Sequence, residues 1–197
     1  MAELIAYVAL YGVVMSLLAS LVFVIIQAAR KVNAQAILNR GATIMYTEIL
    51  SETIRLNPDT VSAASLSDDG NVINVTFEKK YYYTDDGERK NVEEGDEYNG
   101  KVVKIVYSYT KGEDNIDVAM YTKGATNPNT TTINLDYGMT ITSHPENGAD
   151  TDSIANVFSV DTQNTSNKYV TFHGDLHYDN KKMEFNFIVP VFTAKED

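Results

Sequence analysis

An uncharged, strongly apolar stretch from Leu4 to Ile26 constrains this chain more than any other part of its sequence. At about 1.5 Å per residue, a helix of this length can cross the roughly 30 Å hydrocarbon core of a bilayer. No basic side chain precedes it in residues 1–3, and no small-x-small cleavage site ends it, so it does not look like a cleavable secretory signal. We therefore predict a helix that spans a membrane.

The helical pattern continues beyond this stretch without a break. Apolar residues recur along one stripe, namely Leu38, Ala42, Met45, Ile49 and Leu56. The first proline is Pro58, and the residue before a proline is disfavoured in helical conformation. We therefore predict one helix from Glu3 to Leu56, about 80 Å long at the standard rise. It has a transmembrane half, residues 1–29, and an amphipathic half, residues 30–57.

Residues 58–197 alternate between apolar and polar side chains, which is typical of strands. The segment Asp179-Asn180-Lys181-Lys182 predicts a hairpin turn, Pro190 indicates an edge strand, and the acidic residues 84–100 predict a surface loop or loose hairpin tip. The expected strands cover residues 72–78, 101–109, 116–121, 130–143, 157–160, 169–178 and 183–192. A helix followed by strands predicts an α+β fold, with the amphipathic half packed on the antiparallel sheet of one β-rich domain.

Charge and cysteine content exclude several functions. The formal net charge is −11, and this acidic excess lies beyond residue 56, because residues 1–56 carry three acids against four bases. Such a domain repels phosphate backbones, so we expect no direct binding of nucleic acid. The chain has no cysteine, which excludes disulfides, thiolate metal sites and a cysteine nucleophile.

The three histidines offer no obvious catalytic or metal site in the sequence. His173 and His177 lie four residues apart in a predicted strand, so they would be about 13 Å apart and could not share one metal ion. His144 has acidic neighbours at 146, 150 and 152, but no nucleophile-and-base pattern accompanies it, and we expect a loop residue. We predict no enzyme activity, no cofactor and no metal site; a membrane-anchored hydrolase that uses the acidic loops is the least favoured alternative.

The N-terminal segment Glu3-Leu4-Ile5-Ala6-Tyr7-Val8-Ala9-Leu10-Tyr11-Gly12 resembles the mature N-terminus of type IV pilins and pseudopilins. The later segment 46–56 looks like the end of the same helix in minor, pseudopilin-like members. The resemblance covers about the first 56 residues. The absence of a proline late in the apolar run and of a terminal disulfide favours a minor subunit over the main fibre subunit.

This resemblance implies a structural subunit of a pilus or pseudopilus filament. Such a subunit is first held in the cytoplasmic membrane as a single-pass protein, with its C-terminal domain outside. It then polymerises through its helix into a cell-surface filament. The implied partners are other pilin or pseudopilin subunits, a prepilin peptidase and an assembly platform. In this family the glutamate is the fifth mature residue, whereas Glu3 is the third residue here.

The residues expected to serve subunit assembly lie in the first twenty positions. A carboxylate at the edge of the hydrocarbon is unfavourable unless it is paired, and the terminal amine of a neighbouring subunit would neutralise it. Small residues at four-residue spacing would let helices approach closely in a membrane. The expected assembly residues are Glu3, Leu4, Tyr7, Tyr11, Gly12, Ser16 and Ser20.

The sequence leaves a second function open. Arg30 and Lys31 follow the apolar stretch, and the positive-inside rule would then place the domain in the cytoplasm, unless a basic leader precedes Met1. The alternative is therefore a single-pass anchored domain that binds a ligand or protein and does not polymerise. Replacement of Glu3 distinguishes the two, because an anchor should tolerate it and assembly should not.

Overall fold

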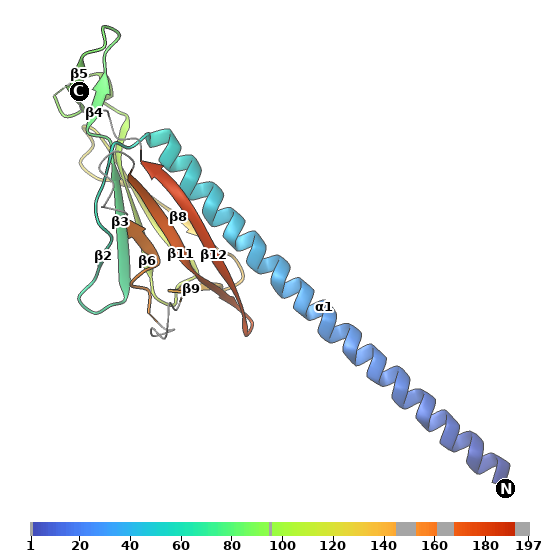
Figure 1. The fold of residues 1–197 in the computed structure, drawn as a ribbon. Coiled ribbons are helices and arrows are strands. Elements are labelled where there is room, and N and C mark those ends of the chain that lie inside the picture. The colour runs from blue at the N-terminus through green and yellow to red at the C-terminus, as the bar shows by residue number, and fades with distance from the viewer. Residues whose placement is uncertain (1, 95, 145–152, 161–167, 192–197) are drawn as a thin grey trace.

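A computed structural model describes residues 2–94, 96–144, 153–160 and 168–191, and it has the α+β fold predicted from the sequence. A single long helix, α1 (Ala2–Leu56), leaves the β-rich domain as a rod (Figure 1). Its C-terminal half lies along the domain, and its N-terminal half extends away from it (Figure 1).

The helix ends where the sequence predicted. Leu56 is its last residue, and Asn57 takes a left-handed conformation with φ of 48°, which asparagine tolerates better than most residues. The Asn57 amide still donates to the Thr53 carbonyl at 3.0 Å, which completes the last turn. Pro58 then prevents the helix from continuing, because it has no amide hydrogen.

The described strands form two main antiparallel sheets and a small hairpin. The first sheet has the order β1 (Thr60–Val61), β3 (Val72–Glu78), β6 (Val102–Thr110), β7 (Asn115–Thr122), β8 (Asn129–Asn134), with β2 (Ser65–Leu66) also paired to β3. The second has the order β10 (Phe158–Val160), β11 (Lys168–Tyr178), β12 (Lys181–Val191), with β9 (Thr140–Thr142) also paired to β11. β4 (Tyr81–Tyr83) and β5 (Arg89–Asn91) form the hairpin, and a 3-10 turn, Asp96–Tyr98, follows.

One core lies between the two sheets and the C-terminal half of α1. The helix packs against β11 and β12 of one sheet and against β6 and β8 of the other. Of the predicted stripe, Leu38, Met45 and Ile49 are fully enclosed, Leu56 is buried and Ala42 is half-buried. The helix also buries Ala34, Gly41 and Thr53, which the stripe did not include. Tyr107 of β6 meets Phe172 of β11 edge to face, with ring centroids 6.4 Å apart, so the sheets also contact each other directly.

The predicted strand 130–143 is wrong, because the chain turns in its middle and its two ends join different sheets. Asp136, Tyr137 and Gly138 all have positive φ, of 63°, 55° and 68°, which ends β8 and redirects the chain into β9. Tyr137 is 59% exposed, whereas period-two alternation would have buried it. Local periodicity alone could not reveal this turn, because the apolar residues on either side of it are buried as predicted.

The hairpin of β11 and β12 is confirmed, with a tighter turn than predicted. Tyr178 pairs with Lys181, which leaves only Asp179 and Asn180 in the turn, both in the left-handed conformation that a type I′ turn requires. Within the described strands β12 is the outer member of its sheet, in agreement with the position of Pro190.

Candidate functional site

The N-terminal part of α1 is exposed on all sides. Every residue from Glu3 to Asn33 is exposed, and Ala34 is the first whose side chain the domain buries. At about 1.5 Å per residue this exposed part is roughly 45 Å long, longer than a bilayer core is thick. Within the described residues it is one helix that is long and apolar enough to span a membrane, and it is compatible with a single-pass anchor.

All seven residues expected to serve assembly lie in this exposed part. Leu4, Tyr7 and Tyr11 have 69%, 72% and 64% of their surface exposed. A Cβ added to Gly12 would meet no atom within 4 Å, so no contact inside the chain requires glycine there. These side chains are therefore available to lipid or to a second protein.

The large and small residues fall on different sides of the helix. At about 100° per residue, Leu4, Tyr7 and Tyr11 lie within about 60° of one another, and the direction of Gly12, Ser16 and Ser20 lies about 150° away. Glu3 is on the side of Tyr7, four residues before it, in the first turn where the helix dipole favours a negative charge. We call these two sides the tyrosine face and the small-residue face.

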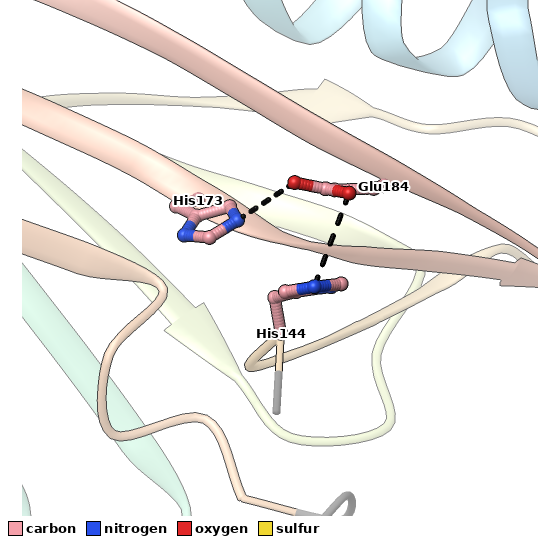
Figure 2. Close-up of side chains that lie close together, drawn as sticks. All are labelled: His144, His173 and Glu184. Carbon is pink, nitrogen blue, oxygen red and sulfur yellow. Dashed lines mark hydrogen bonds and ion pairs between the residues drawn. The ribbon is translucent and has the colours of Figure 1, made fainter. Parts of the chain in front are cut away.

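A second cluster of chemistry-bearing side chains lies on the sheet of β9, β11 and β12. His173 is on β11, Glu184 is on β12, and His144 follows β9 by two residues (Figure 2). The pairing of Thr142 with Asp175, extended by two residues, brings His144 beside His173. Their rings lie 5.0 Å apart, tilted by 32°.

The polar atoms of this histidine cluster (His144, His173 and Glu184) converge. The Nε2 atom of His173 is 3.1 Å from Oε1 of Glu184, and the Nε2 atom of His144 is 3.9 Å from its Oε2 (Figure 2). One ligand atom from each of the three residues lies within 4.8 Å of the other two. The three side chains are partly exposed, so the cluster is open to solvent.

Asp175 lies beside the cluster, on β11 opposite Glu184, and holds His144 in place. Its side chain is almost fully buried, and Oδ1 accepts a hydrogen bond of 3.0 Å from Nδ1 of His144, while Oδ2 accepts one of 3.1 Å from Nζ of Lys182. Burial alone would raise the pKa of Asp175, but the bonds from His144 and Lys182 outweigh it and the pKa is lowered. The same hydrogen bond is the main reason that the pKa of His144 is raised.

The histidine cluster could not be predicted from spacing along the chain, because its three residues come from segments that are distant in the sequence. His177 is not part of the cluster, in agreement with the prediction that His173 and His177 do not share a site: its Nε2 atom lies 2.8 Å from the Thr142 hydroxyl and forms a hydrogen bond with it. The acids at 146, 150 and 152 lie outside the described residues. The signal that could have found the cluster is the pairing of β9 with β11, which the wrongly continuous strand 130–143 concealed.

Comparison of the chain with protein-family models, with curated proteins and with solved structures found no match. The long apolar helix packed on antiparallel sheet is consistent with a pilin-like fold.

Proposed function

We propose that this chain is a pilin-like structural subunit that is held in a membrane by α1 and polymerises through the exposed part of that helix. The observation that carries the proposal is that α1 is exposed on every side from Glu3 to Asn33 and has two distinct faces there. A plain anchor needs only apolar side chains all round, and lipid does not distinguish a tyrosine face from a small-residue face.

Opposite faces of unlike shape suit a filament. When the large side chains of one helix enter the groove left by small residues on another, the contact is between different surfaces of the two copies. Such head-to-tail contacts build an open helical assembly when the rotation between successive copies does not close a ring. Neither the tyrosine face nor the small-residue face is covered by the rest of its own chain, so each added subunit would present a new free face.

The proposal assigns Glu3 the role of setting the register between subunits. Once helices leave lipid for a filament core, a carboxylate in an apolar bundle needs a positive partner, and the terminal amine of a neighbouring chain supplies one. The proposed partners are thus other pilin-like chains, with a prepilin peptidase and an assembly platform, and the acidic domain faces outward from the membrane. No catalytic step is part of this function.

Glu3→Ala and Glu3→Gln test this role in cells that produce the chain with its native assembly genes. Filaments that contain the protein are counted by immunogold electron microscopy, and its amount in the membrane is measured by blotting. We expect both variants to reach the membrane at normal levels and to enter filaments at least about tenfold less often, because each removes the charge. Glu48→Ala, a change at an exposed glutamate elsewhere on the same helix, is the matched control and should assemble normally.

The anchored binding domain makes the opposite prediction. If wild-type protein remains dispersed in the membrane, and if Glu3→Ala and Glu48→Ala behave alike, the chain is an anchor and the polymerisation proposal is wrong. The orientation of the domain is measured in the same cells by its protection against external protease. A domain outside the membrane should be cleaved, whereas one that Arg30 and Lys31 hold inside by the positive-inside rule should be protected.

A further inference from the structure

The histidine cluster has the ligand composition of a transition-metal site. It combines two imidazoles with one carboxylate, a set that suits zinc and related dications, whereas calcium and magnesium prefer oxygen ligands alone. Three protein ligands leave a four-coordinate ion one further position, and the partial exposure of all three side chains leaves that position open to water.

The distances within the cluster are close to those a metal ion would impose. Bonds of about 2.0–2.1 Å in a tetrahedral arrangement place neighbouring ligand atoms about 3.3 Å apart. The Nε2 atom of His173 is already 3.1 Å from Oε1 of Glu184, and the Nε2 atom of His144 is 3.9 Å from the other carboxylate oxygen, Oε2. All three ligand atoms lie within 4.8 Å of one another, so side-chain rotations that shorten the longest separation by about 1.5 Å complete the site.

Asp175 supplies the supporting contact that metal-binding histidines ordinarily have. Its carboxylate can only accept a hydrogen bond, so Nδ1 of His144 must carry the proton that it donates to Oδ1 at 3.0 Å. In the neutral ring this leaves the lone pair on Nε2, the atom that points toward Glu184 in Figure 2. A carboxylate that fixes a histidine in this tautomer strengthens it as a metal ligand.

The fold holds the ligands at fixed relative positions. His173 and Glu184 lie on strands paired over eleven consecutive residue pairs, and Asp175 pairs with Glu184 on one side and with Thr142 on the other. Gly174 allows β9 to approach, because a Cβ at this position would lie 2.5 Å from the Thr142 carbonyl oxygen. These restraints lower the entropy that would be lost when the ion binds.

We propose that His144, His173 and Glu184 bind one zinc-type dication, with Asp175 as the residue that positions His144. The ion would join the chain beyond β9 to β11 and β12. This inference is independent of polymerisation, since it concerns a surface of the globular domain.

Titration of the full chain with zinc chloride tests the site directly. The protein is kept in detergent micelles, with a purification tag that contains no histidine, and binding is followed by isothermal titration calorimetry. We expect one zinc ion per chain and no comparable response to calcium or magnesium. Cobalt(II), used as a spectroscopic substitute, should give the visible absorption of a four-coordinate ion.

Single substitutions assign the ligands. His144→Ala, His173→Ala and Glu184→Gln should each lower zinc affinity at least about tenfold, and Asp175→Asn should lower it about 10- to 100-fold through the lost orientation of His144. His177→Ala is the matched control, because His177 lies on β11 four residues from His173 and bonds to Thr142 instead. It should bind zinc like the wild type.

A second measurement does not depend on the folding of any variant. In wild-type protein with labelled histidine, zinc should shift the ring resonances of His144 and His173 and leave those of His177 in place. The proposal is overturned if wild-type protein binds no stoichiometric zinc at micromolar concentrations. It is equally overturned if His177→Ala weakens binding as much as His144→Ala, or if the resonances of all three histidines shift alike.

Discussion

The hydroxyl of Tyr109 on β6 joins the two sheets, and its removal should destabilise the domain more than removal of the neighbouring Tyr107 hydroxyl. The Tyr109 oxygen accepts the Ile141 amide hydrogen at 2.7 Å, and it also lies 3.2 Å from the carbonyl oxygens of Ile141 and Glu113. Ile141 is in β9, which belongs to the other sheet. The side chains of both tyrosines are fully buried on the same face of β6.

The two hydroxyls differ in what they leave behind. Tyr109→Phe leaves the buried Ile141 amide hydrogen without an acceptor, which should lower the free energy of unfolding by about 1.5–3 kcal/mol. Tyr107→Phe removes bonds of 3.2 Å to the Ile49 carbonyl and to the Thr53 hydroxyl. That carbonyl keeps its helical hydrogen bond, and the hydroxyl can rotate toward it, so the loss should be about 0.5–1.5 kcal/mol.

Urea unfolding of the full chain in detergent, followed by tyrosine fluorescence because the chain has no tryptophan, compares the two variants. Both lose one oxygen atom from a buried ring, so their apolar burial is the same. We expect Tyr109→Phe to be the less stable variant by about 1 kcal/mol, with faster hydrogen exchange in residues 139–143. Equal stability of the two variants would refute the bridging role of the Tyr109 hydroxyl.

Three further predictions concern stability. His144→Gln should destabilise the domain most between about pH 4 and 6.5, because the raised pKa of His144 and the lowered pKa of Asp175 keep both groups charged in that window. The effect should be lost as the pH rises through the pKa of folded His144 or falls through that of folded Asp175. Unfolding measured over a series of pH values tests this. Gly174→Ala should lose about 1–3 kcal/mol in thermal unfolding, because its Cβ meets the Thr142 backbone, whereas Gly41→Ala should lose less, because the flexible end of Met139 can move. Asp59→Ala should speed hydrogen exchange at residues 80 and 81, whose amides the buried Asp59 carboxylate accepts at 2.8–3.1 Å.

Local signals in the sequence were sufficient for the helix and for six of the twelve described strands, namely β3, β6, β7, β10, β11 and β12. The 3.6-residue stripe identifies which side of α1 is buried, and Pro58 fixes its end, because both effects act within a few residues. The same holds for β3, whose bounds and buried face, Ile73, Val75 and Phe77, agree with the alternating pattern. Such features need no knowledge of distant contacts.

Long-range pairing could not be predicted in the same way. The turn at residues 136–138 depends on backbone conformations that the period-two pattern does not encode, and it assigns β8 and β9 to different sheets. The histidine cluster follows from that assignment, since His144 reaches His173 only because β9 pairs with β11. Side chains 29 positions apart in the sequence meet through sheet topology, and no local spacing announces this.

Gly41 illustrates a related difficulty within the helix. By intrinsic propensity, glycine in a helix interior loses about 1 kcal/mol relative to alanine. The structure supplies the reason for it, because Gly41 is buried and the side chain of Met139 lies against it, where a Cβ would collide. Glycine at this position thus leaves the space that the side chain of Met139 occupies.

Site-specific photo-crosslinking tests most directly whether the exposed helix joins subunits. A photoreactive phenylalanine analogue replaces Tyr11 on the tyrosine face in living cells, and the crosslinked peptides are sequenced by mass spectrometry. The account predicts crosslinks to the small-residue face, residues 12–20, of another copy or of the equivalent segment of another pilin-like chain, and their loss in Glu3→Ala. Crosslinks to lipid alone, unchanged by Glu3→Ala, would contradict it.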